Sequence, residues 1–122
     1  MRGPTTGWRE REARNEARFR VQNEWTSQAP KSFAGPAATA NFVCECGDAD
    51  CREPIALTRI EYELVRAHST HFAVRRDHEN PESEIVLSEC SRFAVISKIE
   101  GASLRIARST DPRTDTTTGE QA

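Results

Sequence analysis

The sequence predicts a small α+β domain, in which a short antiparallel sheet packs with one or two helices behind a polar N-terminal helix. Three observations favour this fold: an early Arg-, Glu- and Ala-rich stretch without Gly or Pro, several short β-branched and aromatic runs, and one well-capped helix. The chain has 122 residues. We expect a helix and flexible linker over residues 1–40, the α+β core over residues 41–108, and a disordered tail over residues 109–122.

The predicted N-terminal helix covers residues 8–27, and its apolar residues do not form a single face. At about 100° per residue they divide between two nearly opposite sides, Ala13, Ala17 and Val21 on one and Trp8 and Phe19 on the other. We therefore expect a helix that docks loosely on the core or finds its partner in another chain. The Pro, Gly, Ala and Thr residues that follow are typical of a linker.

A short strand over residues 41–44 is expected to lead into a cysteine-rich turn, and residues 54–57 lead out of it. The next segment, Thr58-Arg59-Ile60-Glu61, is a capping box, because the hydroxyl of Thr58 can accept the Glu61 amide while the carboxylate accepts the Thr58 amide. The helix that it opens is expected to run to about Ala67. Its predicted apolar face contains Ile60, Leu64 and His68.

The rest of the core is expected to hold a strand, a polar loop, a hairpin and a short closing helix. Asp111-Pro112 should end that helix, since the residue before a proline avoids helical conformation. The expected ranges are 72–75 for the strand, 76–82 for the loop, 84–87 and 92–98 for the hairpin, and 102–108 for the helix.

The distribution of charge argues against a dedicated nucleic-acid surface. The first forty residues carry seven basic and four acidic side chains, whereas the predicted core carries nine basic and twelve acidic ones. Nucleic-acid-binding proteins present a clustered basic face instead. In the N-terminal helix, Glu10 and Arg14, like Glu16 and Arg20, have the spacing of helical ion pairs, so we expect a solvated charged face.

The sequence contains no candidate signal peptide or membrane span. The N-terminal region lacks the apolar stretch of about 7–15 residues found in a signal peptide, and no apolar run approaches the roughly 20 residues of a transmembrane helix. We therefore expect a cytoplasmic protein, whose thiols stay reduced.

Cys44, Cys46 and Cys51 lie within eight residues, in a polar turn that also contains Gly47. Three cysteines could be incidental core residues, but a polar turn is not where cysteines of an apolar core are expected. The spacing suits a structural zinc with four Cys or His ligands. The glycine is expected to adopt a positive φ, so that the turn folds back and directs backbone amides at the sulfur atoms. A zinc ion would also stabilise a core too small to bury much surface.

The chain offers four candidates for the fourth zinc ligand. We favour His78, which lies in a polar loop twenty-seven residues after Cys51, a gap typical of the two halves of zinc sites. The alternatives are Cys90 at the predicted hairpin turn, His68 on the apolar face of the capped helix, and His71 directly before a strand.

The segments Phe42-Val43-Cys44-Glu45-Cys46-Gly47-Asp48 and Asp77-His78-Glu79 resemble a family of small, mostly uncharacterised, largely actinobacterial proteins with a Cys-Glu-Cys-Gly-x3-Cys core. The likeness covers about residues 11–113 and includes the polar N-terminal helix. Family members typically have Gly-His-Glu in the later loop, where this chain has Asp77 in place of the glycine. The resemblance implies zinc binding and favours His78, and it implies no reaction.

Three classes of function follow from these features. An enzyme would need an open zinc position or an activated nucleophile, but a Cys3His set fills all four zinc positions. The sequence also lacks the ligand spacing of zinc deaminases and a phosphate-binding loop, so we expect no enzyme. A redox switch would use the zinc thiolates with Cys90 as a resolving thiol. We favour a non-enzymatic, zinc-stabilised interaction or regulatory module. Its N-terminal helix would bind a protein partner through Trp8 and Trp25, and the alternative is that these two side chains pack back onto the helix's own core.

Overall fold

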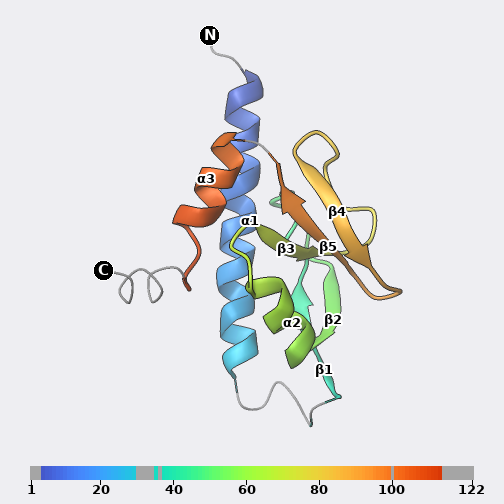
Figure 1. The fold of residues 1–122 in the computed structure, drawn as a ribbon. Coiled ribbons are helices and arrows are strands. Elements are labelled where there is room, and N and C mark those ends of the chain that lie inside the picture. Colours follow the sequence, from blue (N-terminus) through green and yellow to red (C-terminus); the bar gives the residue numbers. More distant parts are fainter. Residues whose placement is uncertain (1–3, 30–34, 36, 100, 114–122) are drawn as a thin grey trace.

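The computed structural model describes residues 4–29, 35, 37–99 and 101–113, and it confirms the α+β fold (Figure 1). Residues 30–34 and 36 of the expected linker, and residues 114–122 of the expected tail, lie outside the described residues. Within them, each predicted element is present with its ends moved by a few residues at most. The order is α1 (Pro4–Gln28), β1 (Thr39–Val43), β2 (Pro54–Thr58), α2 (Arg59–Arg66), β3 (His71–Val74), β4 (Glu84–Glu89), β5 (Ala94–Lys98) and α3 (Gly101–Ser109).

The strands form two small antiparallel sheets. β1 pairs with β2, and β3, β5 and β4 form a three-stranded sheet in that order. The cysteine-rich turn is therefore the connection between β1 and β2. In the second sheet β4 is an edge strand, and its register against β5 shifts between Val86 and Ser88, which makes Leu87 the extra residue of a β-bulge.

The core contains one apolar cluster between the first sheet and α2, and another that joins the second sheet to α3. In the first cluster the ring of Phe42 stacks on that of Tyr62, with centroids 4.6 Å apart. The second cluster contains Phe72, Val74 and Ile96, together with the three clustered cysteines. The cysteine-rich turn is thus part of the packed interior.

The predicted capping box is present at the start of α2. The amide of Glu61 donates to the hydroxyl of Thr58 at 3.1 Å, and the amide of Thr58 donates to the Glu61 carboxylate at 2.8 Å. These two bonds satisfy donors that would otherwise be left open at the helix start. The sequence therefore predicts the beginning of α2 correctly.

The buried face of α2 differs from the predicted one. Tyr62, Val65 and Arg66 are buried, whereas Ile60 and Leu64 are 65% and 67% exposed. Arg66 is buried because it pairs with acidic side chains from other parts of the chain, a contact that an apolar pattern does not predict. The expectation that Ile60, Leu64 and His68 face the core was wrong.

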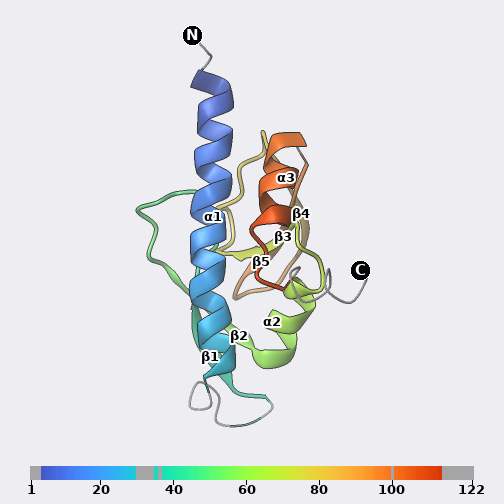
Figure 2. The ribbon, with the colours of Figure 1, turned by 90° about the vertical axis from the view of Figure 1, so that its left-hand side faces the viewer.

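α1 is held firmly against the core, so the expectation of loose docking was also wrong. It packs along α3 and β1 over much of its length (Figures 1 and 2). Arg20 donates to the carbonyls of Ser69 and Ala107 at 2.6 and 2.7 Å. The buried polar residues of α1 are Glu16, Arg20, Asn23, Glu24 and Ser27.

Lys98 of β5 ties α1 to the second sheet. Its Nζ atom lies 3.0 Å from Oε1 of Glu12, 3.0 Å from Oε1 of Glu16 and 2.8 Å from Oε2 of Glu84. The predicted pairing of Glu16 with Arg20 was wrong, since both side chains are buried and bind other groups. The three carboxylates are close enough to hold a metal ion, but the Lys98 ammonium already neutralises part of their charge, so we assign no metal there.

A second ionic cluster joins α1 and α2 to the segment after α3. Arg66 pairs with Glu24 at 2.5 Å and also with Asp111. Arg113 pairs with Glu24 at 2.8 Å and with Glu63 at 2.8 Å. The packed contacts therefore extend beyond the expected core to Arg113. Within the described residues, no helix combines the length and apolar character needed to cross a membrane.

Candidate metal centre

The turn between β1 and β2 and the loop after β3 bring four potential metal ligands together. The ligand atoms of Cys44, Cys46, Cys51 and His78 all lie within 4.8 Å of one another. The three cysteines are buried and His78 is half-buried. This Cys3His cluster could hold a metal ion, and it consists of the four residues that the sequence analysis favoured.

The separations of the donor atoms fit a tetrahedral ion. Nδ1 of His78 lies 3.5 Å from Sγ of Cys44 and 3.7 Å from Sγ of Cys51. A zinc ion with bonds of about 2.3 Å to sulfur and about 2.05 Å to nitrogen would place these atoms about 3.6 Å apart at the tetrahedral angle. Three thiolates with one imidazole are a donor set that zinc accepts, as do other ions that bind sulfur. The residues therefore fit zinc without singling it out.

Backbone amides point at the sulfur atoms, as the sequence analysis expected. The amide of Arg75 donates to Sγ of Cys44 at 3.1 Å. Hydrogen bonds from the amides of Asp48 and Glu53 reach Cys46 and Cys51 and act to lower the pKa of each thiol. Such donors stabilise thiolate charge beside a bound cation.

The three thiols differ in their pKa values. A hydrogen bond from Cys44 lowers the pKa of Cys46 to about 5. The same hydrogen bond, together with burial, raises the pKa of Cys44 far above its ordinary value, and burial raises the pKa of Cys51. A divalent cation favours the thiolate form of every cysteine that it binds, so it would remove this inequality.

Glu45, between the first two cysteines, belongs to the fold rather than to the ligand set. It is fully buried, and its carboxylate accepts hydrogen bonds from the Ala73 amide at 2.9 Å and from Nδ2 of Asn23 at 2.8 Å. Asn23 also exchanges two hydrogen bonds of 2.8 Å with the backbone of Val43. Neither role was predicted from the sequence; the available signal was a carboxylate directly after a short apolar strand.

Gly47 lies directly against α1. No glycine in the described residues has a positive φ, so the conformational role predicted for Gly47 was wrong. A Cβ atom added at this position would lie 2.0 Å from Cγ and 3.0 Å from Cβ of Glu12. The carbonyl of Gly47 also accepts a hydrogen bond of 2.9 Å from Asn15. The position requires glycine because α1 approaches the turn so closely.

We expect Gly47→Ala to lower the free energy of unfolding by about 1–3 kcal/mol, because the methyl group must push α1 away from the turn. Urea unfolding of the metal-loaded protein measures this loss. The same substitution in a Glu12→Ala background should cost less, since Cγ of Glu12, at 2.0 Å, is then absent and Cβ, at 3.0 Å, is the one close atom that remains. Equal costs in the two backgrounds would contradict this explanation.

Asp77 shapes the loop that presents His78. Its φ is 71°, in the left-handed region that glycine adopts most easily and that Asp and Asn tolerate better than most residues. The turn is closed by the His78 amide, which donates to the Arg75 carbonyl at 3.0 Å.

Asp77→Gly should leave the stability unchanged or raise it by up to about 1 kcal/mol, whereas Asp77→Val should lower it by about 1–2 kcal/mol, because a β-branched side chain resists a positive φ. Urea unfolding gives both values, and a competition assay with a chelator shows whether the valine variant also weakens metal binding. If valine were tolerated as well as glycine, the strain at Asp77 would not matter.

The other candidate ligands lie outside the Cys3His cluster. Cys90 is exposed at the turn between β4 and β5. The rings of His68 and His71 contact each other at a tilt of 38°, with centroids 4.4 Å apart. The observations therefore give no support to a redox switch in which Cys90 acts as the resolving thiol.

Comparisons with protein-family models, curated proteins and solved structures found no match to this chain. The interpretation of the cluster accordingly rests on its residues and their geometry.

Proposed function

We propose that the chain is a non-enzymatic, zinc-stabilised interaction or regulatory module, in which the Cys3His cluster is a structural zinc site. The observation that carries this proposal is the set of four protein donors within 4.8 Å of one another, with His78 at tetrahedral separations from Cys44 and Cys51. Four protein ligands leave no position for water or substrate, whereas catalytic zinc sites keep one position open. We therefore propose that the ion stabilises the fold and takes part in no reaction.

The surroundings of the cluster support a structural role. The three cysteines pack with Phe72, Val74 and Ile96 of the second sheet, although they belong to the turn of the first sheet. His78 follows the second sheet's first strand. An ion bound by all four ligands would therefore join the two sheets, which share little other regular hydrogen bonding in the described residues.

Metal analysis of the freshly purified, reduced protein tests the proposal. We expect one zinc ion per chain in the wild type and in Cys90→Ser. In His78→Ala the affinity for zinc, measured by chelator competition, should be at least tenfold lower. Cys90→Ser is the matched control because it removes a thiol outside the cluster. Protein without zinc, or zinc that depends on Cys90 and not on His78, would overturn the proposal.

We further propose that the module binds a protein partner through the outward side of α1. Trp25 is 75% exposed, and Val21, one turn earlier on the same side, is also exposed. Figure 2 shows α1 running lengthwise through the view, with α3 beside it. Exposed aromatic residues of this kind commonly become the buried anchors of an interface.

Co-purification from source cells tests the partner proposal. We expect a stoichiometric partner with the wild type, its loss in Trp25→Ser, and its retention in Gln22→Ser, a control at another exposed position of α1. Retention by Trp25→Ser, or the lack of any stoichiometric partner of the wild type, would count against this surface.

A further inference from the structure

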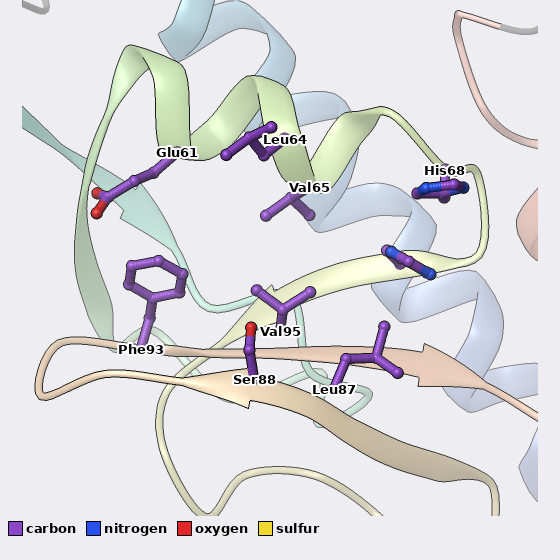
Figure 3. A pocket seen from close by; sticks show the side chains of 9 residues that line it. Glu61, Leu64, Val65, His68, Leu87, Ser88, Phe93 and Val95 are labelled. Atoms are coloured by element: carbon purple, nitrogen blue, oxygen red, sulfur yellow. The ribbon is translucent and has the colours of Figure 1, made fainter.

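An apolar cavity of about 320 Å³ lies between α2 and the β4–β5 hairpin (Figure 3). Leu64 and Val65 of α2 form one wall, and Leu87, Phe93 and Val95 form the other. The cavity is on the opposite face of the second sheet from the Cys3His cluster, since Val95 points into it while its neighbours Ala94 and Ile96 pack in the cluster's core. It is thus a separate site.

This cavity is the reason that the apolar face of α2 is not part of the core. Leu64 is 67% exposed and Leu87 is 45% exposed, although both have large aliphatic side chains. The β-bulge in β4 turns Leu87 as well as Ser88 toward the cavity. A bulged edge is a poor template for adding another strand, so the cavity itself, rather than the strand edge, is the feature suited to a ligand.

The two ends of the cavity differ in their polar groups (Figure 3). At one end Glu61 is the only residue with a permanently charged side chain among the described lining residues, and its two carboxylate oxygens accept hydrogen bonds from Arg92 at 2.9 and 2.6 Å. At the other end lies His68, and the ring of His71, which also lines the cavity, contacts that of His68 at a tilt of 38°. Within the described part of the chain, neither imidazole takes part in a hydrogen bond or an ion pair.

We propose that the cavity binds an aliphatic carboxylate of about eight carbon atoms, with its chain between α2 and the hairpin and its carboxylate at His68 and His71. The volume equals that of about ten water molecules, at about 30 Å³ each, which matches a ligand of roughly ten non-hydrogen atoms. At the end of the cavity with Glu61, the charge is already paired with Arg92. The polar group of the ligand should therefore lie at the other end, beside the imidazoles. A carboxylate can accept hydrogen bonds from the N–H groups of both imidazoles, which have no such partner among the described residues.

This proposal does not depend on the zinc site, and it predicts proton-linked binding. The carboxylate favours the protonated form of the imidazoles, so binding should strengthen as the pH falls toward 6. Among the residues that the structure describes, the only other charged group that lines the cavity is Glu61. Its ion pair with Arg92 lowers the pKa of Glu61, so the pair persists over this range. A neutral ligand of the same length should bind without this pH dependence.

An NMR titration of the metal-loaded full chain with octanoate, and separately with octan-1-ol, tests the proposal. We expect the amide signals of Leu64, Leu87 and Val95 to shift with both ligands. Burial, and then the charge of His68, lower the pKa of His71, and a bound carboxylate acts against this lowering. The dissociation constant for octanoate should therefore fall between pH 8 and pH 6, whereas that for octan-1-ol should stay the same. Equal affinities for the two ligands at pH 6 would overturn the assignment of the histidines.

Variants separate the two parts of the site. His68→Gln combined with His71→Gln should abolish the pH dependence for octanoate and keep octan-1-ol binding, which also shows that the variant is folded. Leu87→Ser should weaken both ligands, while Ile99→Ser, an exposed aliphatic residue outside the cavity, should weaken neither. Retained pH dependence in the double variant, signal shifts spread evenly over α1, or a dimer that buries Leu64 without ligand would overturn the proposal.

Discussion

A chelator that removes the ion from the Cys3His cluster should unfold the core at physiological temperature. The cysteines are packed among apolar side chains of the second sheet, so without a cation their polar and charged sulfur atoms would be buried at a cost. Structural zinc contributes an apparent binding free energy of about 10–16 kcal/mol at neutral pH in small zinc-binding peptides. The total stability of a domain is about 5–15 kcal/mol. The free energy lost with the ion is therefore as large as the total stability of such a domain, or larger.

Thermal unfolding followed by circular dichroism, with and without a strong chelator, measures this effect. We expect the wild type to lose its cooperative transition on chelation, or to melt at least about 15 °C lower, as a loss of several kcal/mol implies for a domain of this size. Cys46→Ser should resemble the chelated protein even with zinc present, and Cys90→Ser should resemble the loaded wild type. An unchanged melting temperature after complete metal removal would show that the bound ion does not stabilise the fold.

The parts of the fold that the sequence predicts well are those determined by neighbouring residues. The capping box of Thr58 and Glu61 needs only a spacing of three, and it forms as predicted. The three clustered cysteines are likewise close in sequence, so their meeting requires a single turn. His78 was predictable because it combines a ligand side chain with a polar loop, and the structure brings it to the cysteines.

The parts that could not be predicted depend on pairs of distant residues. α1 lacks a single apolar face, yet it is well docked, because its buried polar side chains find partners such as Ala107, which follows Arg20 by eighty-seven residues. The need for glycine at position 47 comes from Glu12 on another element. The periodicity of apolar residues contains no information on hydrogen bonds and ion pairs between distant residues. A helix that is held by such polar contacts is therefore predicted, from its sequence, to be loosely docked.

Lys98→Met should be the most damaging substitution outside the Cys3His cluster. The buried ammonium of Lys98 is shared by the carboxylates of Glu12, Glu16 and Glu84. Removing one partner of a buried ionic group costs about 3–5 kcal/mol, because the remaining charges lose their compensation. Burial alone would lower the pKa of Lys98, but the surrounding carboxylates raise it above its ordinary value, so the cation is present at every pH at which the protein would be studied.

The loss in Lys98→Met should depend on pH. Burial, and then the neighbouring Glu84, raise the pKa of Glu16 well above its ordinary value even with Lys98 present. Without the cation the carboxyl pKa values should rise further, so the folded state binds more protons than the unfolded state. Stability then falls as the pH rises above the ordinary carboxyl pKa. We therefore expect the variant to be closest to the wild type near pH 5, and furthest below it at pH 7 and above.

Urea unfolding of the variant and the wild type, compared at each pH from about 5 to 8, isolates this difference, because the response of the metal site to pH is common to both. Adding Glu16→Gln and Glu84→Gln to Lys98→Met should restore most of the lost stability at pH 7, since amides carry no charge to compensate. Arg105→Met, at an exposed cation of α3, should change stability by less than about 0.5 kcal/mol. If Lys98→Met cost as little as Arg105→Met, or if its cost were the same at pH 5 and pH 7, the three carboxylates would not depend on Lys98 for their burial.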